Sequence, residues 1–301
     1  MAANSDGSRS ANRSPFDGER RFTSEITPRR ESPRNAEAKS RVDADRRDVA
    51  ALVEQCAGLP PTRDFAAALR GGSHLGVISE VKRRSPSKGD LFADLDPAEL
   101  AATYERGGAS CLSVLTDDAH FGGSAADLAA ARAAVPLPVI RKDFTVSALD
   151  VCDARLMGAD CVLLIVAALS DDELHEFGEL AAAIGLDALV ETHDEAEVER
   201  ALNAGSTGLI GVNQRDLVTF KVDQERAVRV AAAIPHDVVK VAESGVRGRA
   251  DAVALAAAGY DAVLVGEHLV TSGDPAAAVA DLRVPRVAVE APRSGNSPQV
   301  G

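Results

Sequence analysis

The sequence of 301 residues has few aromatic side chains, since Phe, Tyr and Trp together make up 3% and Trp is absent. Hydrophobic residues still account for 46%, so a sizeable core can form, built mostly from Ala, Val, Leu and Ile. Long apolar runs are also missing: the longest, CVLLIVAAL at 161–169, is shorter than the ~20 residues that a membrane helix needs. The chain is long enough for one large globular domain or two ordinary ones.

Positive charge and paired cysteines are scarce as well. The formal net charge is -13 and no long basic stripe is present, which argues against nucleic acid as a partner. The four cysteines form no CxxC pair, and Cys111 and Cys161 lie in strand-like runs, so we expect reduced, buried thiols. The N-terminus lacks the apolar stretch of a secretory signal. We therefore expect a cytoplasmic protein that binds neither nucleic acid nor membrane.

The two ends of the chain differ in composition from its middle. Residues 1–40 contain only three Leu, Ile, Val or Phe side chains, which are Phe16, Phe22 and Ile26. Such a segment buries too little apolar surface to offset its ordering entropy, so we predict a disordered N-terminal extension over 1–40. Pro, Gly and Ser enrichment predicts a flexible tail over 285–301. Residues 41–284 are left for a single catalytic domain that begins with a helical segment.

Short β-branched runs alternate through this domain with Ala-rich segments of helical spacing, such as PAELAATYERGG and SAADLAAARAAV. The eight runs are 77–82, 111–117, 138–144, 161–167, 187–193, 209–215, 238–245 and 262–269. Several helical segments end in Gly just before a strand (GGAS, MGAD, NAGS, AAGY), which suits a left-handed helix C-cap. Strands that alternate with helices pair in parallel through right-handed crossovers.

Eight such units predict an α/β fold of the (β/α)8 TIM-barrel type. The alternative is an open doubly wound sheet, but the GxGxxG fingerprint of its nucleotide-binding members does not follow the first run. In a barrel, the active site lies where the strands end. Polar residues and glycines gather at these predicted ends: Glu80, Lys82, Thr116, Asp117, Lys142, Glu191, Asn213, Arg215, Glu243, Ser244, Gly245, Gly266 and Glu267.

Charged residues inside apolar strands are costly unless they are paired or used, so Lys142 and Glu191 are either structural ion pairs or catalytic groups. Glu80 and Lys82 are two residues apart and should point the same way from their strand. Around them, SEVKRRSPSKGD gathers Lys82, Arg83, Arg84 and Lys88 within seven residues. This cluster is either a solvated loop or part of an anion site.

Glycines follow the last two predicted strands, in ESGV and VGEHL. The loops after strands 7 and 8 of a barrel often hold a phosphate through backbone N–H groups. The segments therefore indicate a phosphorylated substrate, and the alternative is ordinary turn glycines.

Seven segments resemble the signature motifs of the indole-3-glycerol phosphate synthase family, in the expected order over roughly residues 60–284. They are SEVKRRSPSKG (79–89), LTDDAHFGGS (115–124), VIRKDF (139–144), LVETHDEAE (189–197), IGVNQRDL (210–217), VAESGV (241–246) and VLVGEHLV (263–270). The resemblance implies a single barrel that uses no cofactor and no metal. It implies conversion of 1-(2-carboxyphenylamino)-1-deoxyribulose 5-phosphate to indole-3-glycerol phosphate, with loss of CO2 and water, in tryptophan biosynthesis. Association with other tryptophan-pathway enzymes is a further expectation.

The resemblance also implies roles for individual residues. Lys142 corresponds to the general acid that protonates the ketone oxygen during ring closure, and Glu191 to the acid/base residue of the later dehydration. Lys82 corresponds to a lysine that binds anionic substrate groups and can deliver a proton, and Glu80 to the carboxylate that orients it. How the acid/base roles divide among Lys82, Lys142 and Glu191 stays open.

Further residues are implied to bind the substrate. Those expected near its carboxylate, hydroxyls or aromatic ring are Ser85, Asn213, Arg215, Glu243, Leu115, Phe121 and Phe144. Those expected at its phosphate are Ser244, Gly245, Gly266 and Glu267, of which Glu267 stands where some members have Ser.

The N-terminus departs from the family pattern, which usually starts with an apolar-faced extra helix near the substrate entry. The corresponding AEAKSRVDADRRDVAALVEQC is more polar at its start. Val42, Val49, Leu52 and Val53 still give one apolar stripe, so we expect a shorter or looser lid.

Two other interpretations compete with the synthase. Phosphoribosylanthranilate isomerase is another phosphate-binding barrel, but its acid/base pair is a Cys and an Asp at other strand ends, and it lacks the SPSKG stretch. A non-catalytic, phosphate-binding paralogue would be expected to lose Lys142 or Glu191, and both are present.

Overall fold

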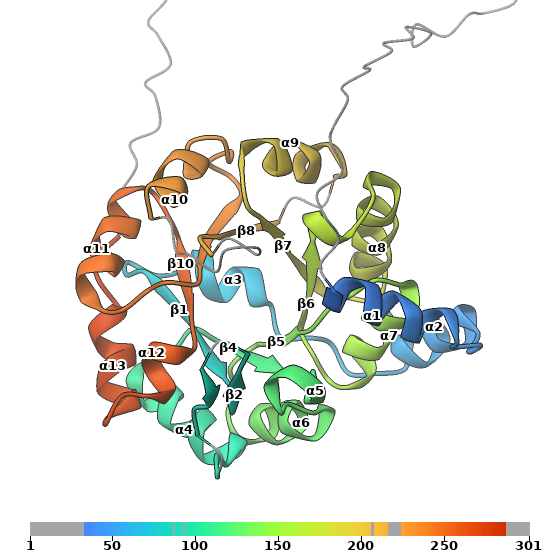
Figure 1. Ribbon diagram of the computed structural model, residues 1–301, viewed down its shortest axis with the longest axis horizontal. Helices are drawn as coiled ribbons and strands as arrows, with labels where there is room; N and C mark the ends of the chain where they lie inside the picture. The colour runs from blue at the N-terminus through green and yellow to red at the C-terminus, as the bar shows by residue number, and fades with distance from the viewer. Residues whose placement is uncertain (1–32, 87, 93, 206–207, 216–223, 287–301) are drawn as a thin grey trace, which may run out of the picture. The chain divides into compact units, whose positions relative to one another are not determined.

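The computed structural model describes residues 33–86, 88–92, 94–205, 208–215 and 224–286 (Figure 1). Within them, eight parallel strands form a closed barrel in the order β1-β10-β9-β8-β7-β6-β5-β4. These strands are β1 Gly76–Val81, β4 Cys111–Leu115, β5 Val139–Lys142, β6 Cys161–Ile165, β7 Asp187–Thr192, β8 Leu209–Asn213, β9 Val239–Glu243 and β10 Ala262–Val265. The first and last strands pair directly, with Gly76 opposite Ala262 and Ser79 opposite Val265. The predicted TIM barrel is confirmed, and the open sheet is excluded.

Helices follow the strands and surround them (Figure 1). They are α4 Pro97–Gly107, α6 Ala125–Ala134, α7 Ala148–Leu156, α8 Asp171–Ala183, α9 Glu195–Asn203, α10 Gln224–Ala231, α11 Arg249–Ala257 and α13 Pro275–Leu282. Most begin at a Ser or Asp whose side chain accepts a hydrogen bond from the first turn, as Asp96 and Ser147 do. Left-handed glycines end helices as predicted: Gly108 caps α4 with φ of 88°, and Gly158 follows the C-cap of α7 with φ of 92°.

The core is aliphatic, as the composition predicts. Every residue of β1, β4, β6, β8, β9 and β10 is buried, because parallel strands are covered on both faces. Two of the rare aromatic residues are fully enclosed, and their hydroxyls are satisfied: Tyr104 donates to Glu80 O at 3.1 Å and Tyr260 to Ala227 O at 2.7 Å. The four cysteines are buried and form no disulfide. None of the helices in the described part of the chain combines the length and apolarity needed to cross a bilayer.

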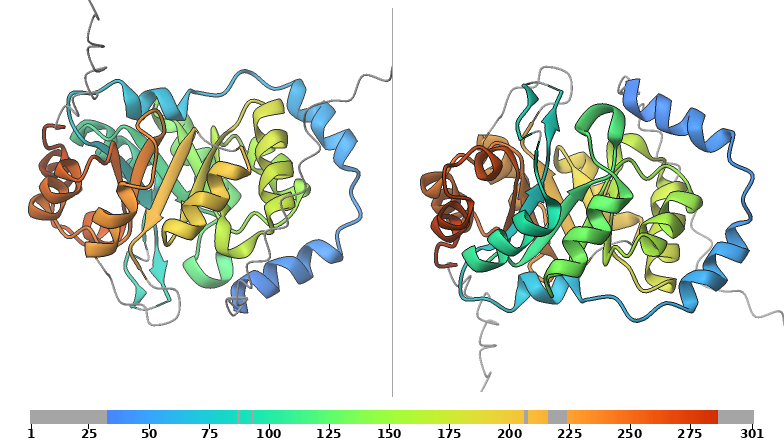
Figure 2. Two further views of the ribbon diagram at one scale, coloured as in Figure 1. Left: turned by 90° about the horizontal axis from the view of Figure 1, so that it is seen from above. Right: turned by 90° about the horizontal axis from the view of Figure 1, so that it is seen from below.

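Helix α3 (Phe65–Arg70) covers the barrel end opposite the hairpin formed by β2 (Arg84–Ser85) and β3 (Gly89–Asp90) (Figure 2). Phe65 and Leu69 are buried. The backbone N–H groups of Phe65 and Ala66 donate to Asp187 Oδ2 at 2.9 and 3.0 Å, which joins α3 to the start of β7. Helix α3 therefore closes the core at its end of the barrel, and the candidate site residues lie at the end that carries the hairpin (Figure 2).

The end of the barrel that carries the β2–β3 hairpin also carries helix α1 (Pro33–Asp43; Figure 2). Short elements in the strand-to-helix loops complete it: α5 Asp118–Phe121, η1 Val166–Ala168 and α12 Glu267–Val270. Helix α2 (Val49–Ala57) packs along α7. The hairpin stands where the sequence predicted only a loop, because strands of two residues show no hydrophobic alternation.

The N-terminal boundary predicted from composition is wrong for residues 33–40, which belong to helix α1. Asn35 is 3% exposed and donates to Ala168 O at 3.3 Å, and Arg41 forms an ion pair with Asp150 at 2.9 Å. Helix α1 packs against the barrel although it has few apolar residues, because it supplies the buried amide of Asn35 and the side chain of Ala38. The rest of the predicted extension, residues 1–32, lies outside the described residues.

The predicted C-terminal tail begins two residues too early. Pro285 forms an isolated bridge with His74, and Arg286 N donates to Ser73 O at 2.9 Å. Both residues therefore belong to the barrel domain, and residues 287–301 lie outside the described part of the chain.

Candidate active site

A buried ion cluster lies where β5, β7 and β9 end. The Nζ atom of Lys142 is 3.1 Å from Glu191 Oε2 and 3.5 Å from Glu243 Oε2. The two carboxylates are 3% and 2% exposed, and the lysine side chain is 17% exposed. The predicted convergence of these strand ends on one region is confirmed.

The three groups of this cluster affect one another's protonation. Burial alone would lower the pKa of Lys142, but the charges of Glu191, Glu243 and Glu80 outweigh it and raise the pKa above its ordinary value. Burial likewise works against ionised Glu191, yet Lys142, His193 and the amide of Asn213 lower its pKa. For Glu243, burial and the neighbouring charge of Glu191 raise the pKa. Glu243 is therefore the carboxylate that holds a proton most readily, and Lys142 remains an ammonium.

A second pair lies on β1 and just after it. Lys82 Nζ contacts Glu80 Oε1 at 3.1 Å, so the two side chains do point the same way, as their spacing predicts. The Glu80 side chain passes over Gly266 at the end of β10: a Cβ there would collide with its carboxylate oxygen and would lie 3.0 Å from its Cδ. Gly266 thus leaves room for a catalytic candidate, a packing reason that the sequence did not reveal.

Asn213 joins β8 to the cluster. Its Nδ2 donates to Glu191 Oε1 at 3.0 Å, and its Oδ1 accepts from Arg215 N at 3.0 Å. Both ends of the amide are used within the protein, so Asn213 holds the carboxylate of Glu191 in place. Arg215 is half-buried and is the last described residue before 216–223.

A histidine that sequence reasoning missed lies behind Glu191. His193 is 2% exposed, with Nε2 3.7 Å from Glu191 Oε1 and Nδ1 3.0 Å from Glu197 Oε2. Strand side chains alternate between faces, so a residue two positions after Glu191 points the same way as Glu191. This spacing could have predicted His193, which lies one residue past the end of β7.

Each of the four cations at residues 82–88 pairs with a carboxylate of the protein, as Lys82 does with Glu80. Arg83 pairs with Asp127 at the start of α6 and donates to Leu95 O at 3.1 Å. Its guanidinium is therefore held by protein partners, and it fixes the loop after β1. Arg84 pairs with Asp90 across the hairpin at 2.8 Å. Lys88 forms an ion pair with Glu267, which brings the hairpin to the end of β10.

Of the three residues predicted to form an aromatic pocket, Phe121 has cations near its ring. The Arg34 guanidinium from α1 lies 5.3 Å from the ring centroid and Lys82 Nζ lies 5.4 Å from it. Leu115 is buried at the end of β4, and Phe144 is half-buried just after β5.

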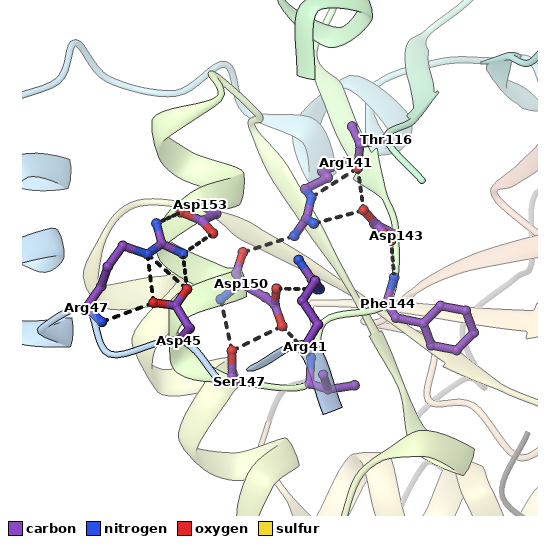
Figure 3. Close-up of polar contacts among 11 residues, drawn as sticks. Arg41, Asp45, Arg47, Thr116, Arg141, Asp143, Phe144, Ser147, Asp150 and Asp153 are labelled. Carbon is purple, nitrogen blue, oxygen red and sulfur yellow. Dashed lines mark hydrogen bonds and ion pairs between the residues drawn. The ribbon is translucent and has the colours of Figure 1, made fainter. Parts of the chain in front are cut away.

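A polar network braces the end of β5 (Figure 3). Arg141 is 2% exposed and donates to Thr116 Oγ1 at 3.1 Å and to Asp143 Oδ2 at 2.8 Å. Asp143 Oδ1 in turn accepts from Phe144 N at 2.9 Å. The network fixes the backbone on both sides of Lys142.

The same network reaches α7 and α1 (Figure 3). Arg141 Nη1 donates to Asp150 O at 3.2 Å, and the carboxylate of Asp150 accepts from Ser147 and from Arg41 of α1. A continuous set of hydrogen bonds thus joins α1 to the strand that carries Lys142. Sequence reasoning missed Arg141 and Asp143, because their partners lie on other elements.

The turn after β9 has an unusual backbone. Ser244 has φ 65° and Gly245 has φ 76°, both in the left-handed region that non-glycine residues seldom adopt. Gln214 Nε2 donates to Ser244 O at 3.1 Å and holds the turn. The predicted phosphate site therefore combines a constrained turn at Ser244 and Gly245 with Gly266 and with Glu267, whose partner is Lys88. Among the described residues, no group of three or more His, Cys, Asp and Glu side chains is arranged to hold a metal ion.

Comparison with known proteins gives a consistent result. A family model described as "Indole-3-glycerol phosphate synthase" matches residues 34–282. A protein of that name from Streptomyces griseus is 56% identical over 247 residues, which cover 82% of this chain and 89% of the relative. A protein of the same name from Rhodococcus jostii is 54% identical over 235 residues, or 78% and 87% of the two chains.

Solved structures with low sequence identity share the fold. Thiamine phosphate pyrophosphorylase from Pyrococcus furiosus is 15% identical with a TM-score of 0.54, over 73% of this chain and 96% of the other. A 3-hexulose-6-phosphate synthase from Salmonella typhimurium is 13% identical with a TM-score of 0.56, over 69% and 96%.

Proposed function

The chain belongs to the indole-3-glycerol phosphate synthase family, and we propose that the charged barrel end described above carries out the ring closure. The activity is that of a decarboxylating carbon–carbon lyase of tryptophan biosynthesis. It converts 1-(2-carboxyphenylamino)-1-deoxyribulose 5-phosphate to indole-3-glycerol phosphate with loss of CO2 and water. The assignment of individual residues is the proposal that follows.

Lys142 is the general acid of ring closure. The observation that carries this role is the position of its ammonium between Glu191 and Glu243, 3.1 and 3.5 Å away. Lys142 is protonated in the resting site, because Glu191 and Glu243 raise its pKa, so it has a proton to donate. The ketone oxygen of the substrate gains negative charge as the aryl carbon attacks, and it takes the proton from Nζ.

Glu191 serves the dehydration that follows decarboxylation. It is ionised in the resting site, because Lys142, His193 and Asn213 offset its burial, so it can accept a proton. Glu243 shares Lys142 with Glu191 and carries a proton more readily, which gives the site a second acid. This role differs from simple substrate binding, which the resemblance implied for Glu243.

Lys82, oriented by Glu80, binds the anionic groups of the substrate. Ser85 and Arg215 are assigned to its carboxylate and hydroxyls, while Asn213 acts through Glu191. Leu115, Phe121 and Phe144 are assigned to the aryl ring. A substrate ring beside Phe121 would come close to the two cations that already flank that side chain.

The phosphate is assigned to the turn at Ser244 and Gly245 and to the backbone of Gly266 and Glu267. A carboxylate beside a phosphate is unfavourable, and Lys88 offsets it by pairing with Glu267. Cytoplasmic localisation and association with other tryptophan-pathway enzymes stay predictions.

The test is to incubate the protein with the carboxyphenylamino-deoxyribulose phosphate and to follow indole fluorescence. We expect product from the wild type and at least ~10²-fold slower turnover from Lys142→Ala, the scale of general acid catalysis. Arg84→Ala, in the exposed hairpin pair, is the matched cation control and should keep near-normal turnover. If the folded wild type produces no indole fluorescence, the proposed activity is wrong and the protein is a non-catalytic barrel.

A further inference from the structure

His193 lies between two carboxylates, and none of the proton transfers assigned above is given to it. It follows β7 directly, two residues after Glu191, and its side chain is 2% exposed. On one side Nδ1 is 3.0 Å from Glu197 Oε2, and on the other Nε2 is 3.7 Å from Glu191 Oε1. At this distance the imidazole of His193 affects the protonation of Glu191, whether the imidazole is neutral or charged.

The local chain fixes the orientation of the ring. Asp194 caps helix α9 by accepting from Glu197 N at 2.9 Å, so Glu197 occupies the first turn of that helix. The Glu197 carboxylate turns back and accepts from His193 N at 2.7 Å as well as facing Nδ1. Glu197 Oε2 therefore contacts both the backbone N–H and the ring Nδ1 of His193. Rotation of the ring would break the contact with Nδ1, which fixes the ring orientation.

The chemistry of the partners decides which ring atoms carry protons. An ionised carboxylate only accepts hydrogen bonds, so Nδ1 must donate to Glu197. A neutral ring would then present the lone pair of Nε2 to the carboxylate of Glu191, which is repulsive. A protonated ring presents an N–H and a positive charge to both carboxylates. The geometry therefore favours the imidazolium.

We propose that His193, oriented by Glu197, is a positively charged positioning residue that keeps Glu191 ionised between turnovers. It faces Glu191 from the side opposite Lys142: Lys142 Nζ is 3.1 Å from Oε2, whereas His193 Nε2 is 3.7 Å from Oε1. The other groups around Glu191 are Asn213 of β8 and Glu243 of β9, which is the second partner of Lys142. Lys142 is shared between Glu191 and Glu243, so His193 gives Glu191 a second cationic partner.

The inference about the charge can be tested without any turnover. In protein labelled with ¹⁵N-histidine, one of the six histidines gives the ring signals that disappear in His193→Asn. At about neutral pH these signals should show protons on both ring nitrogens, as expected for an imidazole paired with two carboxylates. Glu197→Gln keeps an acceptor for Nδ1 but removes the charge, and it should move the ring toward the neutral form. A neutral His193 in the wild type overturns the proposal.

The consequence for Glu191 rests on the proposed function and is tested by the pH profile of kcat. An opposite charge within ~4–6 Å favours the ionised form of a carboxyl, so His193→Asn should move the acidic limb of the profile upward by about one pH unit. Glu197→Gln should move it in the same direction by less. His175→Asn is the control, since His175 contacts only Ala204 O among the hydrogen bonds described here.

The possible failures can be told apart. An inactive wild type refutes the proposed function and leaves the ¹⁵N result standing by itself. An active wild type whose acidic limb is the same in His193→Asn refutes the role of His193, even if the variant is less stable, because a purely structural histidine lowers stability without moving the limb.

Discussion

Replacing Gly266 with alanine tests whether the packing of Glu80 against β10 matters for the active site. The new Cβ would collide with the Glu80 carboxylate oxygen and would lie 3.0 Å from its Cδ and 3.2 Å from its Cβ. These separations are shorter than the ~3.5–4.0 Å of favourable carbon contacts. Glu80 must therefore move, and its contact with Lys82 at 3.1 Å is lost or strained.

Overpacking of this kind costs about 1–3 kcal/mol of folding free energy. We expect Gly266→Ala to lower the free energy of unfolding by that amount in equilibrium urea titrations. It should also lower kcat/KM by at least about tenfold, which corresponds to about 1.4 kcal/mol of transition-state stabilisation. Gly273→Ala is the matched control, because a Cβ there meets no atom within 4 Å.

A double-mutant cycle identifies Glu80 as the residue through which the effect acts. In a Glu80→Ala background the carboxylate is gone, and Gly266→Ala should lose most of its effect on both quantities. The coupling free energy should exceed about 0.5 kcal/mol. Equal effects of Gly266→Ala in both backgrounds would refute the reasoning and would point to the phosphate site instead.

Three further changes test other parts of the description. Asn35→Ala removes the buried donor to Ala168 O and should lower the free energy of unfolding in urea by about 1 kcal/mol. Ser40→Ala, on the exposed face of α1, should change the free energy of unfolding little. Equal stabilities of the two variants would mean that α1 does not pack as described. Arg83→Ala releases the loop after β1 from Asp127 and should raise KM more than it lowers kcat in steady-state kinetics. Arg83→Lys should restore only part of the loss, because lysine cannot rebuild the bidentate guanidinium contact. A loss of kcat with unchanged KM would contradict this. The raised pKa of Glu243 means that the folded state binds its proton more tightly than the unfolded state, so ionisation costs stability as pH rises above the ordinary carboxyl range. Glu243→Gln cannot ionise, and its advantage in urea midpoint over the wild type should widen from about pH 5 to about pH 9; parallel curves would show that the pKa of Glu243 is not raised.

The barrel could be predicted from the sequence because its signal repeats. Eight apolar runs, separated by helical segments of which several end in glycine, specify parallel strands and crossovers whatever the details of each loop. The hairpin at Arg84–Ser85 and Gly89–Asp90 carries no such signal, since two residues are too few for a period. Residues 33–40 of helix α1 were assigned to the disordered extension because composition averages over all faces of a segment, whereas the packing depends on one buried amide, Asn35.

The active-site residues were predictable where they sit on strand ends, and less so where a partner is distant. Lys142, Glu191 and Glu243 meet because parallel strands end at one edge. Arg83 was assigned to solvent or to a ligand, because its partner Asp127 lies on α6, 44 residues away.

Some of the missed contacts depend on how side chains cross between elements. Arg141 and Asp143 stabilise the catalytic strand through Thr116 and α7, and the spacing of residues along the chain gives no sign of such a network. The reason for Gly266 likewise became visible only with the side chain of Glu80 in place.

The most direct test of the central claim, that Lys142 and Glu191 divide ring closure and dehydration between them, is a single-turnover experiment on Glu191→Gln. Glutamine preserves the shape of the side chain and its hydrogen bond to Asn213 but cannot take up the proton. Release of CO2 and indole fluorescence are recorded from the same reaction, with the wild type beside it. The account predicts that the variant releases CO2 and then stalls, so that indole appears at least ~10²-fold later than in the wild type. If CO2 and indole rise together in Glu191→Gln with the wild-type time course, Glu191 is not the dehydration group, and the assignment is contradicted.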